Sequence, residues 1–402
     1  MKAYLVSLGC PKNLTDSEVI MGQLVSSGYQ MTDQPAAADV IVVNSCAFLK
    51  TARQETVKVL REMRRYKKKI YLAGCLPGWL EKTKGKIKLP KIDGVIDSMG
   101  LFDYCTPRIK ATPPWTAYVK IAEGCNNCCS YCLIPTIRER LKVRKIEDIL
   151  REVEGLAKRG VKEIIFIAQD TTAHPGLAKL LSKTARIKGI HWIRIMYSYP
   201  SHISDGLIKI IACEKKIVKY LDLPIQHVNS AVLKKMNRKY DREQLERLIY
   251  KLREKIPGLA LRTSVIVGFP GEGEREFAEL LEFTKKIKFD RLGVFKYERE
   301  EGTAAAKMKE QLSEKTKTER FHRLMGIQQK ISRERNQEWI GHKLEVLIEG
   351  KEGRYYFGRS FRDAPEIDGR VFVKSSRMVK SGTLLKMKIT RAEAYDLFAA
   401  AK

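Results

Sequence analysis

A predicted β-strand leads directly into a group of cysteines in residues 117–132, which read AYVKIAEGCNNCCSYC. The apolar and β-branched run at 117–122 is typical of a buried strand. The cysteines that follow it are Cys125, Cys128, Cys129 and Cys132. Because loops at the carboxyl ends of the strands carry the chemistry of β/α barrels, this junction indicates a barrel with a metal centre at its mouth.

Cys125, Cys129 and Cys132 have the spacing C-x3-C-x2-C. Three thiolates on one loop can hold three irons of a 4Fe–4S cluster and leave the fourth iron free to bind S-adenosylmethionine (SAM). The alternative is a zinc knuckle that also uses Cys128. Zinc sites usually join two separated cysteine pairs, and four ligands within eight residues leave little loop to surround a tetrahedral ion. The spacing therefore favours the cluster, with Cys128 beside it rather than bound to it.

Strands and helices alternate on both sides of this junction, across residues 109–335. Strands are expected at 117–122, 163–168, 192–196, 219–223, 261–267 and 291–296, with helices that include 146–158, 242–255 and 274–286. Six such units in about 220 residues predict a partial (β/α)6 barrel. A long polar helix, from Gln311 to near Arg335, is expected to close this domain.

Residues 1–108 also alternate strands with helices, which predicts a doubly wound parallel sheet. Strands are expected at 2–7, 39–43 and 69–73, with a helix at 51–69. Cys10, Cys46 and Cys75 each come just past the end of one strand. Since ligands bind at the carboxyl edge of such sheets, we expect the three thiols to meet there and hold a second iron–sulfur cluster. The alternative is three buried structural cysteines, because free cysteine is among the most buried residue types.

Residues 336–402 have a different pattern, with glycines between short strands and no helical periodicity. The strands are expected at 344–348, 354–359, 370–373 and 384–389. This pattern predicts a small β-barrel of the kind that binds nucleic acids. The chain is therefore predicted to be an α/β protein with three domains, at residues 1–108, 109–335 and 336–402.

The chain is strongly basic, with 76 Lys and Arg against 47 Asp and Glu and a formal net charge of +29 in 402 residues. Such a surface attracts polyanions without any sequence recognition. No apolar run approaches the roughly 20 residues that cross a bilayer, so we expect a soluble, cytoplasmic protein with no membrane partner. In a reducing compartment its nine cysteines are more often ligands or catalytic groups than disulfides. Cys105 and Cys213 follow no predicted strand and are not expected to be ligands.

Blocks of sequence along essentially the whole chain resemble the radical-SAM methylthiotransferase family. In the first domain they are SLGCPKN at 7–13, NSC at 44–46 and AGC at 73–75. In the central domain they are EGC at 123–125, CLIP at 132–135, IAQDTT at 167–172, LPIQH at 223–227 and VGFPGE at 267–272. Within this family the chain is most similar to the RimO type, because DAPEIDG at 363–369 resembles the RimO version of the C-terminal TRAM domain.

This resemblance implies transfer of a methylthio group to the β-carbon of an aspartate in ribosomal protein S12. It implies two uses of SAM, as methyl donor and as source of a 5′-deoxyadenosyl radical. It also implies two 4Fe–4S clusters, one held by Cys10, Cys46 and Cys75 and the other by Cys125, Cys129 and Cys132. The implied partners are S12, free or in the small subunit, and an electron donor such as flavodoxin or ferredoxin. The net charge of +29 leaves room for contact with rRNA as well.

The expected SAM contacts are Gln169, Arg262, Gly268 and Glu272, each of which could instead shape a turn or cap a strand. No catalytic side chain is assigned. Two positions depart from the family pattern, with Glu139 where Gly is usual and Gly273 where Thr is usual. Both are expected near the SAM pocket, so local contacts there should differ.

Two other functions fit parts of the sequence. A tRNA methylthiotransferase would use the same cofactors, and the net charge of +29 favours it. The acidic residues of 363–368 oppose it, because as an exposed face they would repel a phosphate backbone and attract a basic protein. A non-catalytic iron–sulfur or RNA-binding protein would explain the cysteines and the β domain, but it gives the glycine-rich turn at 268–273 no purpose.

Overall fold

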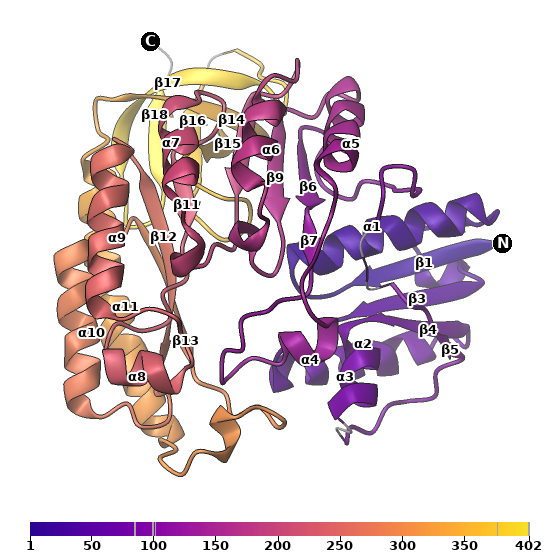
Figure 1. Ribbon diagram of the computed structural model, residues 1–402. Helices are drawn as coiled ribbons and strands as arrows, with labels where there is room; N and C mark the ends of the chain where they lie inside the picture. Colours follow the sequence, from indigo (N-terminus) through magenta and orange to yellow (C-terminus); the bar gives the residue numbers. More distant parts are fainter. Residues whose placement is uncertain (84–85, 99, 101, 376, 401–402) are drawn as a thin grey trace. The chain divides into compact units, whose positions relative to one another are not determined.

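The computed structural model describes residues 1–83, 86–98, 100, 102–375 and 377–400. They fall into two compact units, one comprising Met1–Gly176 with Glu298–Lys307 and the other Leu177–Tyr297 with Met308–Lys402. Strands and helices alternate along most of the chain and an all-β region ends it, which is the predicted α/β class (Figure 1). Within the described ranges, no helix is both long and apolar enough to cross a membrane.

A five-stranded parallel sheet begins the first unit, in the order β2-β1-β3-β4-β5. Its strands are β1 (Lys2–Ser7), β2 (Gln30–Met31), β3 (Val40–Ser45), β4 (Lys69–Gly74) and β5 (Gly94–Val95). Its helices are α1 (Pro11–Ser26), η1 (Pro35–Ala37), α2 (Lys50–Arg64) and α3 (Cys75–Thr83). Every residue of β3 is buried, as expected for a central strand with both faces covered. The strand order reverses between β1 and β3, and ligands of doubly wound sheets bind beside such a reversal.

The register of this sheet aligns the carboxyl ends of its central strands. Ser7 in β1 pairs with Asn44 in β3, and Asn44 pairs with Ala73 in β4. The chain segments that carry Cys10, Cys46 and Cys75 therefore leave the sheet at one edge, as the sequence predicted.

The first unit also contains the start of the central domain. Its strands are β6 (Thr116–Lys120), β7 (Ala122–Glu123), β8 (Lys142–Val143) and β9 (Glu163–Ile167), and its helices are α4 (Ile134–Arg138), α5 (Ile146–Lys158), η2 (Thr171–Ala173) and η4 (Ala305–Lys307). β6 pairs in parallel with β9, and β7 pairs antiparallel with β8. Helix α5 buries Ile149, Val153 and Leu156 on one face, and its bounds are those expected from this helical spacing.

The second unit continues the alternation of strands and helices. Its strands are β10 (Trp192–Ile195), β11 (Tyr220–Asp222), β12 (Ala260–Val267) and β13 (Arg291–Lys296), and the last three form a parallel sheet. Its helices are α6 (Leu177–Ala185), η3 (Pro200–His202), α7 (Asp205–Cys213), α8 (Ser230–Lys235), α9 (Arg242–Lys255), α10 (Glu274–Ile287) and the long α11 (Glu314–Gln337). All six strands predicted for the central domain are therefore present.

A closed five-stranded β-barrel ends the second unit, in the order β14-β15-β16-β18-β17. Its strands are β14 (Lys343–Glu352), β15 (Tyr355–Ser360), β16 (Val371–Lys374), β17 (Leu384–Ala392) and β18 (Leu397–Ala400). The sequence predicted the first four and missed β18, because its Leu-Phe-Ala-Ala contains few residues with high β propensity. β18 pairs with both β16 and β17 and so closes the barrel.

The acidic residues of 363–368 do not form an exposed face, so that prediction is wrong. The side chains of Asp363 and Asp368 are only 1% and 2% exposed, and of the three acids in this segment Glu366 alone is exposed. Both buried acids therefore need partners, since an unpaired buried charge is strongly destabilising.

Their partners lie on strands of the central domain. Asp363 accepts a hydrogen bond from Arg291 of β13 (2.6 Å), and Asp368 accepts one from the Tyr220 hydroxyl of β11 (2.7 Å). Asp368 also lies 3.4 Å from Nε of Arg262 on β12. Asp363 and Asp368 of the acidic segment therefore bind the C-terminal barrel to the β11–β12–β13 sheet, and their charges are not exposed at the surface.

We predict that Asp363→Ala lowers the stability of this unit by about 3 kcal/mol, because it leaves the buried Arg291 guanidinium without its carboxylate. The matched control is Glu366→Gln, which removes a charge three residues away on the exposed part of the segment and should stay within about 0.5 kcal/mol of the parent. Thermal and denaturant unfolding of the two variants measures the difference. Equal stability would contradict a fastening role for Asp363.

Candidate functional site

Three cysteines surround the carboxyl edge of the N-terminal sheet. Cys10 directly precedes α1, Cys46 follows β3, and Cys75 is the first residue of α3. A Cβ placed on Gly9 would lie 3.1 Å from the Cys46 sulfur, so the loop that carries Cys10 passes close to Cys46. Cys10 and Cys75 stand at helix amino termini, whose partial positive charge stabilises thiolates.

The electrostatic environment of these thiols is uneven. Burial raises the pKa of Cys75 to about 11 and also raises that of Cys46. Burial acts in the same direction at Cys10, but the nearby charges of Lys12 and Arg138 outweigh it and lower the pKa of Cys10. Arg138 is close enough to all three thiols for its positive charge to favour the thiolate form of each.

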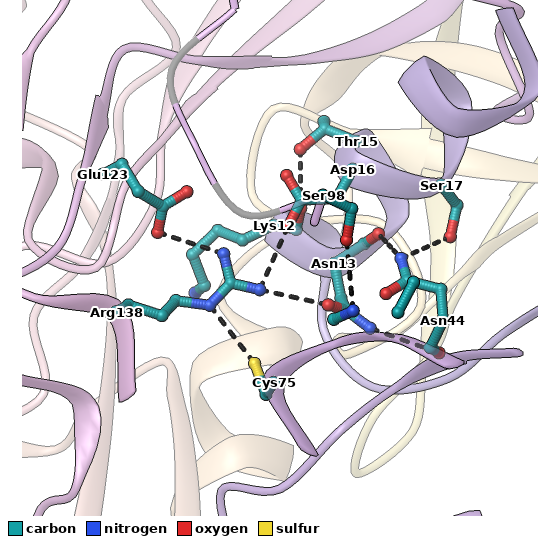
Figure 2. Close-up of polar contacts among 12 residues, drawn as sticks. Lys12, Asn13, Thr15, Asp16, Ser17, Asn44, Cys75, Ser98, Glu123 and Arg138 are labelled. Carbon is teal, nitrogen blue, oxygen red and sulfur yellow. Dashed lines mark hydrogen bonds and ion pairs between the residues drawn. The ribbon is translucent and has the colours of Figure 1, made fainter. Parts of the chain in front are cut away.

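Arg138, the last residue of α4, forms polar contacts with Cys75, Asn13, Asp16 and Glu123 (Figure 2). Its Nε donates to the Cys75 sulfur (3.2 Å) and its Nη1 donates to Oε1 of Glu123 (3.0 Å). Its Nη2 donates both to Oδ1 of Asn13 and to Oδ2 of Asp16, each at 3.0 Å. The guanidinium therefore links α1 and the sulfur of Cys75 to the strand that precedes the second cysteine group.

Lys120 completes a buried charge cluster with Arg138. Its Nζ donates to Asp16 and to Oε2 of Glu123 (2.6 Å), and its side chain is 3% exposed. Burial opposes ionisation of Glu123, yet Lys120 and Arg138 lower its pKa to about 2. Two cations and two carboxylates thus balance each other inside this unit.

The second cysteine group lies in the loop between β7 and α4. The backbone N–H of Cys125 donates to the Glu139 carbonyl (3.1 Å), which joins the start of this loop to the residue that follows α4. The N–H groups of Asn127 and Ile134 point at sulfur, the first to Cys125 and the second to Cys132, both at 3.4 Å. Backbone N–H groups directed at sulfur stabilise thiolates and tune iron–sulfur centres. Cys128 is exposed, and its sulfur donates to the Asn126 carbonyl at 3.7 Å.

Both cysteine groups suit an iron–sulfur cluster in the chemistry of their donors. Each offers three thiols, and two of the thiols in the second group accept backbone hydrogen bonds. Among the residues that the structure describes, no three His, Cys, Asp or Glu side chains converge on a single ion. A cubane cluster has a different requirement, because each cysteine binds a separate iron and the sulfurs stand farther apart than around one metal ion.

Two of the four residues predicted to contact SAM lie together at the end of β12. Oε2 of Glu272 accepts from the Gly268 N–H (2.9 Å), and its Oε1 accepts from Nη1 of Arg320 (2.7 Å). Nε2 of the buried His227 lies 3.5 Å from Glu272. The side chain of Glu272 is wholly buried, so its present role is to hold the turn that follows β12.

Arg262 and Gln169 lie in other surroundings. Arg262 lies on β12, six positions before Gly268, which directly follows the strand; this is about 20 Å at 3.3 Å per residue. Arg262 pairs with Asp222 (2.7 Å). In the first unit, the side-chain N–H of Gln169 donates to Glu123, while its Oε1 is buried without a partner. A SAM contact stays a prediction for all four residues.

The structure shows what each of the two departures from the family pattern changes locally. Glu139 has φ +66°, a left-handed conformation that favours glycine, and its exposed carboxylate pairs with Lys82 (2.9 Å) and Lys142 (3.1 Å). Gly273 precedes α10 and donates its N–H to Oε2 of Glu276 (2.9 Å). Without a side chain it cannot accept a bond from the first turn of the helix, as Thr could.

The sequence analysis missed Arg138, Lys120, Glu123 and Asp16 as a group. A signal was present, because Lys120 interrupts an otherwise apolar strand that the pattern predicts to be buried. A lysine in such a strand requires an acidic partner. The pattern could not name that partner, since Asp16 lies 104 residues earlier in the chain.

Comparison with known families agrees with the three regions of the sequence. The Radical SAM superfamily matches residues 119–284, the uncharacterized protein family UPF0004 matches residues 2–97, and the TRAM domain matches residues 340–401. Each match falls inside one of the three predicted domains.

Curated relatives match nearly the whole chain. A ribosomal protein uS12 methylthiotransferase RimO from Pelotomaculum thermopropionicum is 45% identical, covering 99% of this chain and 98% of the relative. The protein of the same name from Geobacter sulfurreducens is 41% identical, covering 98% of this chain and 97% of the relative. At this identity and coverage the sequences share one family.

Among solved structures, the radical S-adenosylmethionine methyltransferase TsrM from Kitasatospora setae has a similar fold. The TM-score is 0.54 at 13% identity, covering 73% of this chain and 72% of the TsrM chain. This similarity concerns the fold alone.

We predict that Gly268→Ala lowers the thermal stability of the second unit. Gly268 has φ +72°, which costs about 1–2 kcal/mol for a residue with a Cβ, and that Cβ would lie 2.3 Å from Cγ of Lys317. The control is Gly155→Ala in α5, where nothing lies within 4 Å of the added Cβ and alanine favours the helix. Unfolding midpoints should fall for the first variant and stay level or rise for the second. A Gly268→Ala protein as stable as the parent would show that this turn is not constrained.

Proposed function

The chain belongs to the RimO family of radical-SAM methylthiotransferases, and we propose that it adds a methylthio group to an aspartate of ribosomal protein S12. The proposal follows the relatives, which carry this activity in their names over nearly their whole length. The observation that supports it most directly is the presence of two three-cysteine groups in one compact unit, linked through Arg138.

Two 4Fe–4S clusters fit these groups, one on Cys10, Cys46 and Cys75 and the other on Cys125, Cys129 and Cys132. When bound, the clusters and SAM would supply the sulfur, the methyl group and a 5′-deoxyadenosyl radical that removes a hydrogen atom from the β-carbon of the aspartate. The protein then has to hold and shield these groups. The N–H donors of Asn127 and Ile134 would orient the thiolates of the second group, and Arg138 would compensate the negative charge of the first.

The SAM contacts proposed are Gln169, Arg262, Gly268 and Glu272. Gln169 is the best supported, because its side-chain oxygen is buried without a hydrogen-bond donor and a ligand amine could supply one. Gly268 and Glu272 would act through the shape of the turn after β12, since the Glu272 carboxylate is already engaged by Gly268 and Arg320.

The proposed partners follow from the substrate and from the charge. The enzyme would bind S12 in the cytoplasm, either free or in the small ribosomal subunit. Its net charge of +29 would favour contact with the neighbouring rRNA. Reduction of the clusters would require a donor such as flavodoxin or ferredoxin. The same charge favours tRNA as the alternative substrate, and burial of Asp363 and Asp368 removes the electrostatic argument against it.

We predict about eight irons per chain after anaerobic reconstitution. Replacing Cys125, Cys129 and Cys132 together by Ala should remove about half of this iron and all 5′-deoxyadenosine formation from SAM. Cys128→Ala is the matched control, since it removes an exposed sulfur of the same loop and should keep both. Iron analysis and chromatography of the nucleoside give the two readings. SAM cleavage by the triple variant would refute this ligand set.

We predict that the N-terminal cysteines are needed for methylthio transfer but not for SAM cleavage. Replacing Cys10, Cys46 and Cys75 by Ala should leave 5′-deoxyadenosine formation measurable while methylthio transfer falls below detection, because these thiols stand at the sheet edge and not on the Cys125–Cys132 loop. Mass spectrometry of S12 and of tRNA, each incubated anaerobically with SAM, sulfide and a reductant, measures the transfer. If tRNA is methylthiolated and S12 is not, tRNA is the substrate. If the triple variant still forms methylthiolated product, the N-terminal cysteines are not needed for the transfer.

A further inference from the structure

Arg138 is a buried cation in direct contact with one proposed cluster ligand. Its side chain is 2% exposed, and its Nε lies 3.2 Å from the Cys75 sulfur. The remaining donors of the guanidinium are directed to Asn13, Asp16 and Glu123, so the head group is fixed in orientation by four different partners (Figure 2). It cannot turn away from the sulfur without losing bonds to buried acceptors.

Charge neutrality alone does not explain this arrangement. Lys120 already pairs with both Asp16 and Glu123, and each of those carboxylates has a second oxygen that Arg138 satisfies. A lysine at 138 could supply the same charge, but it could not reach the Cys75 sulfur and three oxygens with separate donors in one plane. The part of the geometry that specifically requires arginine is therefore the Nε–H directed at sulfur.

A hydrogen bond and a positive charge at a cluster sulfur both favour the reduced cluster, which carries one more negative charge than the oxidised one. The site is buried, so solvent screens this contact little, while Asp16 and Glu123 offset part of the charge of the guanidinium. The Nε–H bond is the part of the interaction that points directly at the sulfur. The contact would be present in both oxidation states and stronger in the reduced state.

We propose that Arg138 is a positioning residue for the cluster at Cys10, Cys46 and Cys75, and that its Nε–H bond to the Cys75 sulfur raises the reduction potential of that cluster. This inference rests on the proposed ligand set. It gives α4, the helix that follows the Cys125–Cys132 loop, a second role, since its last residue would tune the reduction potential of the other cluster.

The test uses the full-length chain in which Cys125, Cys129 and Cys132 are replaced by Ala, so that only the N-terminal cluster is present. Arg138→Gln and Arg138→Lys are introduced in this background, reconstituted anaerobically and titrated with dithionite while the reduced cluster is followed by electron paramagnetic resonance. The control is Arg140→Gln, which removes an exposed arginine two residues away. Iron per chain is measured for every protein.

The expected midpoint potential is lowest for Arg138→Gln, intermediate for Arg138→Lys and unchanged for Arg140→Gln, all with about four irons. If Arg138→Gln loses iron, retention of iron with a lowered midpoint in Arg138→Lys supports the same conclusion. An unchanged midpoint in an iron-replete Arg138→Gln protein overturns the inference, as does loss of iron from both Arg138 variants. Absence of iron from the background protein itself would instead refute the ligand set of the proposed function.

Discussion

Four buried charges hold the first unit together around its cysteines. Arg138 and Lys120 share Asp16 and Glu123, and each of these side chains is at most 6% exposed. A charge in such a place is tolerated only when it is paired, because breaking one buried pair costs about 3–5 kcal/mol. The pairing requires α1, β6, β7 and α4 to stay in fixed positions relative to each other. The cysteines that flank these elements are ordered as a consequence.

Buried ion pairs also stabilise the second unit, where they join two parts of the fold. Asp363 and Asp368 lie against Arg291 and Arg262, and Asp290 lies 3.0 Å from Arg362. These pairs join the C-terminal barrel to the β11–β12–β13 sheet and leave little negative charge from this segment at the surface.

Two residues with positive φ, Glu139 and Gly268, differ in how closely they are packed. Glu139 has φ +66°, which favours glycine, and its exposed carboxylate pairs with Lys82 and Lys142. At Gly268 the space is filled by Lys317, so the glycine is required by packing as well as by φ. A side chain at the first position extends into solvent, whereas a Cβ at the second would clash with Lys317.

The sequence by itself determined most of the central-domain strands and helices and the strand ends that precede the N-terminal cysteines. The spacing of apolar residues and the turn-forming residues are local features of a sequence. Neighbouring residues therefore sufficed to predict the bounds of α5 and α9 and the strand ends before Cys10, Cys46 and Cys75. Only the tertiary structure decided which distant charges pair. Arg138 meets Asp16 across 122 residues and Asp363 meets Arg291 across 72, and no periodic pattern encodes such a choice. Both acids look like surface residues in the sequence, because burial of a charge depends on a partner that packing alone brings into contact.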